Sequence, residues 1–145
     1  MGNPDLAVMA EKFVVVGVDG SEASLRAVDW AVDEAGYRCA KLRVVHANFL
    51  QHDALNSPIF ENEAKRESAV IQAAVERARL RCPEVAVEAR VVEPPAAESL
   101  IQASIGAELL VVGSRGLSRM QELLLGSVSR ECVLSAQCSV LVVRG

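Results

Sequence analysis

Five short apolar runs, each bounded by glycine or polar residues, are spaced along the chain. They predict strands at Phe13–Asp19, Leu42–Ala47, Val85–Val92, Glu108–Val112 and Ser139–Val143. Continuous runs such as Phe13–Asp19 are typical of strands that are covered on both faces of a sheet. The run Val85–Val92 alternates between apolar and polar residues, which indicates an edge strand with one face partly exposed.

Segments with apolar residues every three or four positions lie between these runs and predict four helices. The first is expected from Ser21, whose hydroxyl suits an N-cap, to about Ala35, and Gly36 is expected to end it. The other three are expected at Glu61–Cys82, Ala96–Ile105 and Ser127–Ser135. Strands that alternate with helices imply a parallel sheet with helices on both faces.

Individual side chains within these elements have expected places. Trp30 lies near the apolar stripe of the first helix and is expected to pack there. Glu67, Arg77 and Arg81 are expected to lie away from the apolar face of the second helix. His46 ends the second strand without a partner visible in the sequence, and we interpret it as structural.

The chain of 145 residues shows no repeat or linker, and we expect one domain over 1–145 with a loose leader at 1–11. Residues 48–60 lack periodicity and are long for a loop in a compact domain, so the segment is expected to be functional or mobile. Whether it closes over a ligand is left open by the sequence.

Composition narrows the classes of protein further. Apolar residues make up 51% and aromatic residues 3%, which predicts an aliphatic core, and the net charge of −4 disfavours a nucleic-acid partner. The apolar runs are too short to span a membrane. The four cysteines lack metal-ligand spacing, and we expect reduced, core or partly buried thiols in a cytoplasmic protein.

Unusual residues follow the first and fourth predicted strands. The first strand ends in Gly17-Val18-Asp19, and the fourth is followed by Gly113-Ser114-Arg115-Gly116. Gly126-Ser127 then begins the last helix. Glycines let the backbone approach a ligand, and a helix N-terminus offers unpaired N–H groups to an anion. If the two strands are neighbours, Asp19 is suited to a ribose or base, and Arg115 to a phosphate.

Plainer interpretations exist for the same residues. Asp19 is suited to capping a strand end, and Ser127 with Gly126 to starting a helix. Gly113 and Gly116 are suited to forming turns. The sequence has no P-loop lysine motif, no G-x-G-x-x-G after the first strand and no G-x-S-x-G. A binding site is therefore indicated more clearly than a catalytic one.

The spacing Gly113-x2-Gly116-x9-Gly126-Ser127 resembles the nucleotide-binding signature of the universal stress protein family. The opening VVVGVDGSEASLRAVDWAVDEA resembles that family's first strand and helix, and the likeness extends over about Phe13 to Arg144. It implies the ATP-binding branch, with a three-layer, Rossmann-like, adenine nucleotide alpha hydrolase-like fold. The implied sheet is open, parallel and five-stranded, with order 3-2-1-4-5 and four helices.

The resemblance also implies a set of ligand contacts. At the adenosine end these are Gly17, Val18, Asp19, Ala47 and Val112. At the phosphate end they are Gly113, Arg115, Gly116, Gly126, Ser127, Val128 and Ser129.

The implied function is that of a regulatory protein that binds ATP, with AMP or cyclic AMP as other ligands and Mg²⁺ brought by the phosphates. Family dimers pair through the last strand, here 139–143, and the uncharged run Val140–Val143 is an edge that such pairing would cover. Two alternatives remain open. One is a weak ATPase that phosphorylates itself on Ser127 or Ser129, and the other is a dimeric interaction module that needs no nucleotide.

Overall fold

The computed structural model describes residues 11–47, 58–115 and 125–144, so most of the predicted leader and residues 48–57 lie outside it. Its strands are β1 (Phe13–Gly17), β2 (Lys41–Ala47), β3 (Val87–Val92), β4 (Leu109–Gly113) and β5 (Val140–Val143). They form one sheet in the order β3-β2-β1-β4-β5, and every neighbouring pair is parallel. The predicted topology is confirmed, with β3 at an edge.

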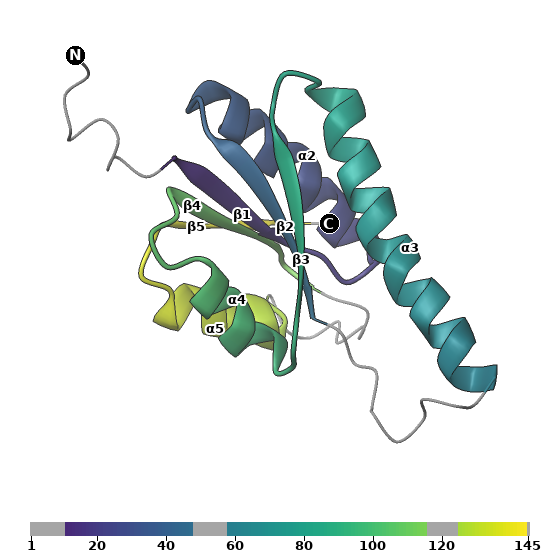
Figure 1. Cartoon of the computed structure of the whole chain (residues 1–145). Coiled ribbons are helices and arrows are strands. Elements are labelled where there is room, and N and C mark those ends of the chain that lie inside the picture. Colours follow the sequence, from purple (N-terminus) through teal and green to yellow (C-terminus); the bar gives the residue numbers. More distant parts are fainter. Residues whose placement is uncertain (1–10, 48–57, 116–124, 145) are drawn as a thin grey trace, which may run out of the picture.

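Helices lie on both faces of the sheet in three layers (Figure 1). The helices are α2 (Glu22–Tyr37), α3 (Pro58–Arg81), α4 (Ala96–Ala103) and α5 (Ser127–Ser135). In β1, Val14 and Val16 pack into the core under α2 and α3, whereas Val15 packs into the core on the α4 and α5 side. Because side chains alternate along a strand, a continuous valine run supplies both cores.

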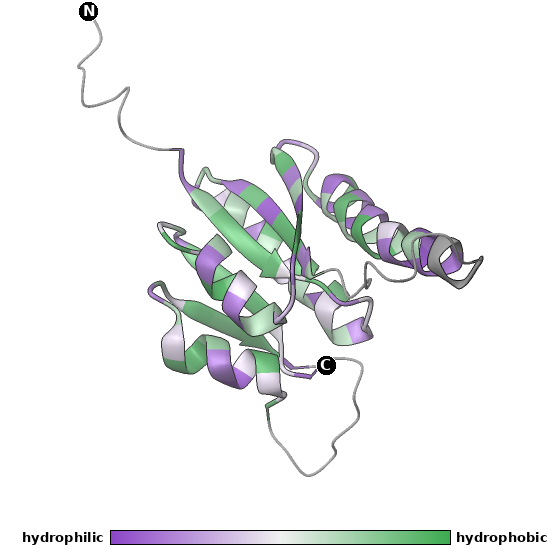
Figure 2. Cartoon of the chain, turned by 60° about the horizontal axis from the view of Figure 1, so that its bottom comes forward, coloured by the Kyte–Doolittle hydropathy of each residue, from purple (hydrophilic) through white to green (hydrophobic). Residues whose placement is uncertain are grey.

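Hydrophobic residues concentrate in the sheet and on the inner faces of the helices, and the outer faces are mainly hydrophilic (Figure 2). Within 11–47, 58–115 and 125–144, no helix has both the length and the apolar character that crossing a bilayer requires.

The first helix continues past the residue that was expected to end it. Gly36 is helical and α2 ends at Tyr37, with Arg38 as the C-cap. The left-handed conformation that closes the turn belongs to Cys39, with φ of 52°. The prediction for Gly36 was wrong because a glycine inside a helix costs only about 0.5–1 kcal/mol relative to alanine, which does not by itself end the helix.

Two bidentate ion pairs join α2 to α3, so the prediction that Arg77 and Arg81 lie away from the packed face was also wrong. Arg77 binds Asp29 with N–O distances of 2.8 and 2.7 Å, and Arg81 binds Asp33 with two distances of 2.8 Å. The hydrogen bonds from these arginines lower the pKa of both aspartates.

Two further expectations about burial were wrong. Trp30 is 53% exposed, because it lies beside the buried stripe of α2 and not on it. Cys39 is exposed at the turn after α2, whereas Cys132 is fully buried on the inner face of α5. Burial raises the pKa of the Cys132 thiol to about 11.

Candidate functional site

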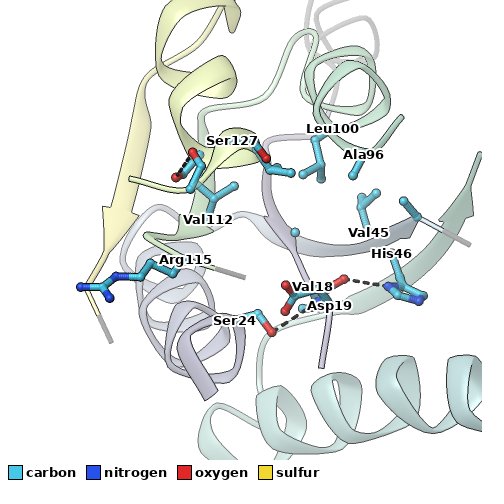
Figure 3. Close-up of a pocket in the computed structure, with 16 residues that line it drawn as sticks. Val18, Asp19, Ser24, Val45, His46, Ala96, Leu100, Val112, Arg115 and Ser127 are labelled. Carbon is cyan, nitrogen blue, oxygen red and sulfur yellow. Dashed lines mark hydrogen bonds between the residues drawn. The ribbon is translucent and has the colours of Figure 1, made fainter. Parts of the chain in front are cut away.

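A cavity of about 260 Å³ opens at the carboxyl ends of β1, β2 and β4, between them and helices α4 and α5 (Figure 3). It lies where strand order reverses, with β1 leading to β2 on one side and β4 on the other. Open parallel sheets bind ligands at such a point. The predicted site residues that line it are Gly17, Val18, Asp19, Ala47, Val112, Gly113, Arg115, Gly126, Ser127, Val128 and Ser129. Gly116 lies outside the described residues.

The end of β1 leads into a compact turn that caps α2. Asp19 Oδ1 accepts a hydrogen bond of 2.9 Å from the Ser21 amide. Ser21 Oγ accepts one of 3.2 Å from the Ser24 amide, which confirms Ser21 as the N-cap. Asp19 thus has the capping role of the plainer interpretation, and it also lines the cavity. Its two carboxylate oxygens allow both.

The glycines at the ends of β1 and β4 lie close to neighbouring elements, against backbone at Gly113 and against a flexible side chain at Gly17. A Cβ at Gly113 would lie 3.0 Å from the carbonyl carbon of Ala23 and 3.1 Å from its oxygen. At Gly17, a Cβ would lie 2.7 Å from Leu100 Cδ1. Gly113 therefore lets the first turn of α2 approach β4, and the sequence pattern alone does not distinguish this need from contact with a ligand.

The glycine that precedes α5 differs from the two at the strand ends. Gly126 has an extended backbone, with φ of −73° and ψ of 170°. Its amide donates to the Ser114 carbonyl at 2.6 Å, and Ser129 Oγ donates to the same carbonyl at 3.0 Å. Ser114 is buried, and its carbonyl links the two residues at the start of α5 to the end of β4. It was not among the predicted site residues, since nothing in the spacing separates it from its neighbours.

The N-terminus of α5 faces the cavity without a side-chain cap from the described residues. The first intrahelical bond runs from the Arg130 amide to the Gly126 carbonyl. The amides of Ser127, Val128 and Ser129 precede it and have no intrahelical acceptor. Together with the helix dipole, they form a site suited to an anion.

The two serines proposed as phosphate acceptors differ in accessibility. The hydroxyl of Ser129 is buried and donates to backbone carbonyls at 3.0 and 3.1 Å. Ser127 is exposed at the mouth of the cavity. Arg115 is exposed as well, and its side chain extends away from the centre of the cavity (Figure 3).

The opposite end of the cavity is aliphatic. Val45, Ala47, Ala96 and Leu100 line it beside Val18 (Figure 3). Sequence reasoning missed three of these residues. Val45 is two residues before Ala47 on one strand and therefore shares its face, which the strand period would have revealed. Ala96 and Leu100 reach the site only because α4 packs across the strand ends.

His46 has partners that the sequence did not reveal. Its Nδ1 lies 2.7 Å from the Val18 carbonyl oxygen, and its Nε2 contacts Oε2 of Glu67 on α3. Glu67 is thus turned toward the sheet, contrary to expectation. Within the described ranges, no cluster of three or more histidine, cysteine, aspartate or glutamate side chains is suited to hold a metal ion.

Comparison with known proteins identifies a family and individual relatives whose sequences are similar to this chain. The sequence model of the Universal stress protein family matches residues 12–144. A universal stress protein of Thermus aquaticus is 37% identical over 142 residues, covering 92% of this chain and 98% of the relative. One from Mycobacterium tuberculosis is 35% identical over 136 residues, covering 92% of this chain but 48% of its own length. The chain therefore spans about half of that relative.

Solved structures agree with the sequence relatives. A universal stress protein crystallised in complex with cAMP has a TM-score of 0.74 at 34% identity, covering 92% of this chain and 97% of its own. An Archaeoglobus fulgidus universal stress protein in complex with dAMP has a TM-score of 0.68 at 23% identity, covering 93% and 99%. The latter shows the shared fold. With the family match over nearly its whole length, this chain belongs to the universal stress protein family.

Proposed function

We propose that this protein binds an adenine nucleotide in the cavity at the strand ends and acts as a nucleotide-dependent regulatory protein in a stress response. The observation that carries the proposal is that one cavity combines an aliphatic end with a helix N-terminus that no described side chain caps. A purine base fits the first, and phosphate groups fit the second. ATP is the expected ligand, and AMP and cyclic AMP are the other candidates.

The geometry suggests one orientation for the nucleotide. The base would pack against Val45, Ala47 and Leu100, and the phosphates would accept hydrogen bonds from the first amides of α5. Asp19 lies between these ends, and its Oδ2 accepts no hydrogen bond from a described residue. A ribose hydroxyl is a suitable donor to that oxygen. With ATP, Mg²⁺ would be held by the phosphates.

The relative crystallised with cAMP supports this assignment. Cyclic AMP contains a base, a ribose and a phosphate, so it has all three groups that the proposed orientation requires. The described residues of this chain offer one surface for each group.

Two measurements test the proposal. Mass spectrometry of the purified, heat-extracted protein should reveal an adenine nucleotide, and calorimetry should show saturable binding of ATP, AMP or cAMP. Gly126→Val is expected to weaken binding by at least about tenfold, because its side chain would enter the mouth of the cavity while its backbone conformation suits any residue.

Ala73→Val is the matched control, because Ala73 is exposed on α3 and does not line the cavity. Binding should be unchanged in this variant. If the wild-type protein carries no nucleotide and binds none of the three ligands, the proposed function is wrong.

We also propose a homodimer through β5. The Ser139 carbonyl accepts a hydrogen bond of 2.9 Å from the Leu110 amide of β4, and the Val143 carbonyl accepts one of 2.7 Å from the Ser114 amide, which follows β4. Because residues alternate along a strand, the backbone groups of Val140 and Val142 point to the open edge. The other edge, β3, carries Glu88 and Arg90, whereas β5 has no charged residue. An uncharged open edge favours pairing with a second copy.

Val142→Pro tests the dimer, since proline at an outward-facing edge position removes a donor without breaking the bonds to β4. Light scattering should show a dimer for the wild-type protein and a monomer for the variant. Val91→Lys on β3 is the control and should remain dimeric. A monomeric wild-type protein would exclude this interface.

A further inference from the structure

The peptide between Val18 and Asp19 is held from both of its ends. Its carbonyl oxygen, on Val18, accepts from His46 Nδ1 at 2.7 Å, and its amide, on Asp19, faces Ser24 Oγ at 3.4 Å. The Val18 amide donates to the Val45 carbonyl at 2.9 Å, which continues the sheet by one residue. The position of the Asp19 carboxylate therefore depends on how His46 is held.

His46 is held by Glu67. The imidazole ring is almost fully buried, with 4% of the side chain exposed, and its Nε2 contacts Oε2 of Glu67 on α3. A backbone carbonyl can only accept, so Nδ1 must carry a proton. Glu67 therefore orients the ring whose Nδ1–H donates to the Val18 carbonyl.

The same region of α3 lies beside the adjoining turn. Gly20 has φ of +88°, and a Cβ there would lie 3.1 Å from Val70 Cγ2. Glu67 and Val70 are three residues apart and share one face of α3. Among the described side chains of α3, Arg77 and Arg81 form ion pairs with α2 instead. Val70 thus lies beside the turn that carries Asp19, and Glu67 reaches that turn through His46.

We propose that His46 and Glu67 are positioning residues, which hold the Val18–Asp19 peptide in the geometry for nucleotide binding and couple that geometry to α3. The inference rests on the proposed function, because Asp19 is placed against the nucleotide there. In this arrangement, α3 and the nucleotide stabilise the same conformation of the turn. Binding at the cavity therefore orders the outer helix, and loss of the α3 contact weakens binding.

Calorimetry with cAMP and AMP tests the coupling. Glu67→Ala is expected to weaken binding by about tenfold, because the His46 ring loses the partner that orients it. Glu67→Gln should restore binding to within about twofold of wild type, since its amide still hydrogen-bonds Nε2. Arg77→Ala is the matched control, because it breaks a contact of α3 with α2 and leaves the Val18–Asp19 peptide untouched.

Nitrogen-15 NMR of the histidine ring supplies a second measurement. If the role of His46 and Glu67 were purely structural, adding cAMP would not change these chemical shifts together. In the wild-type protein, His46 should show a hydrogen-bonded Nδ1–H, and its ring and the amides of Glu67 and Val70 should shift together when cAMP is added. In Glu67→Ala, cAMP should no longer shift the α3 amides.

The outcomes separate the two proposals. Wild-type binding with an unchanged affinity in Glu67→Ala would overturn the positioning role and leave the proposed function intact. An equal loss of affinity in Arg77→Ala would show general destabilisation of α3 and would also overturn it. Failure of the wild-type protein to bind any nucleotide would overturn both.

Discussion

Helices α2 and α5 both begin at the same edge of the sheet, beside the same cavity, but their N-termini differ. At α2, Ser21 caps the helix, Asp19 binds the Ser21 amide, and Glu22 places a negative charge in the first turn. At α5, the N-cap is Gly126, no described side chain caps the helix, and its first turn has no acidic residue. One helix supplies its own acceptors, and the other leaves its donors to a ligand.

This difference explains why the two sites need different residues. An internally capped N-terminus stabilises the fold and has little affinity for an external anion. An uncapped one forgoes that stabilisation and keeps its amides available. The anion site is therefore expected at α5, and Asp19, next to the capped helix, is suited to a neutral hydroxyl donor.

The largest effect is expected when α5 is made to resemble α2. In Gly126→Asp, the new carboxylate would cap the helix and repel phosphate, so the affinity for cAMP should fall about 100-fold or more. The free energy of unfolding should stay the same or rise by a few tenths of a kcal/mol. Calorimetry and urea denaturation measure the two quantities. An undiminished affinity would contradict the assignment of the anion site to α5.

The next effect concerns the packing of α2 against β4. Gly113→Ala is expected to lower the free energy of unfolding by about 2 kcal/mol, because its Cβ would press on the backbone of Ala23. Gly36→Ala is the matched control, since its Cβ would lie 3.7 Å from Val85 Cγ2, in ordinary contact. That variant should gain roughly 0.5–1 kcal/mol, because Gly36 is helical. Denaturation midpoints compare the pair, and a stable Gly113→Ala would refute the packing argument.

Removal of the α2 cap should affect stability but not binding. Ser21→Ala is expected to cost about 1 kcal/mol in the free energy of unfolding. The affinity for cAMP should remain within about twofold, because the Asp19 carboxylate is bound by the backbone amide of residue 21, which the variant retains. Ser21→Asp, which keeps the cap, is the control. A large loss of affinity in Ser21→Ala would mean that the two helix ends are not separate.

The smallest effect concerns the ion pairs between α2 and α3 and how their contribution to stability changes with pH. The pKa values of Asp29 and Asp33 are lowered in the folded protein, so their ion pairs contribute stability above the unfolded pKa of about 3.9 and lose it as the pH falls further. Each contribution should stay below about 1 kcal/mol, because the arginines face solvent. Urea denaturation should show that the free energy of unfolding falls less between about pH 6 and pH 3 in Asp29→Asn than in the wild-type protein. If the free energy of unfolding falls equally in both proteins, the ion pair of Asp29 contributes nothing to it.

Local features of this fold followed from the sequence, and features that depend on distant contacts did not. The Ser21 cap was predicted correctly, because its partner is three residues away. Trp30 was misplaced, because a position beside an apolar stripe becomes buried or exposed according to which element packs next to it. Arg77 and Arg81 were misplaced for the same reason, since their acceptors lie 48 residues earlier in the chain.

For the candidate site, the resemblance named eleven residues that line the cavity within the described ranges, and Gly116 lies outside them. It did not distinguish their roles. Gly113 and Gly126 look alike in the sequence, but a Cβ at the first would press on Ala23, whereas the second has an extended backbone conformation that any residue can adopt. Leu100 was missed, because only the packing of α4 across the strand ends brings it to the cavity. Ser114 was missed, because its hydrogen bonds to Gly126 and Ser129 depend on how α5 packs.

The sequence by itself determined the order of strands and helices, the two-sided burial of β1 and the cap of α2. These depend on periodicity and on contacts within a few residues, which a linear pattern records. Only the tertiary structure decided that His46 meets Glu67, that Gly113 must lack a Cβ and that the N-terminus of α5 faces the cavity without a cap from a described side chain. Those properties arise where separate elements meet in space, and their geometry depends on packing that no local pattern contains.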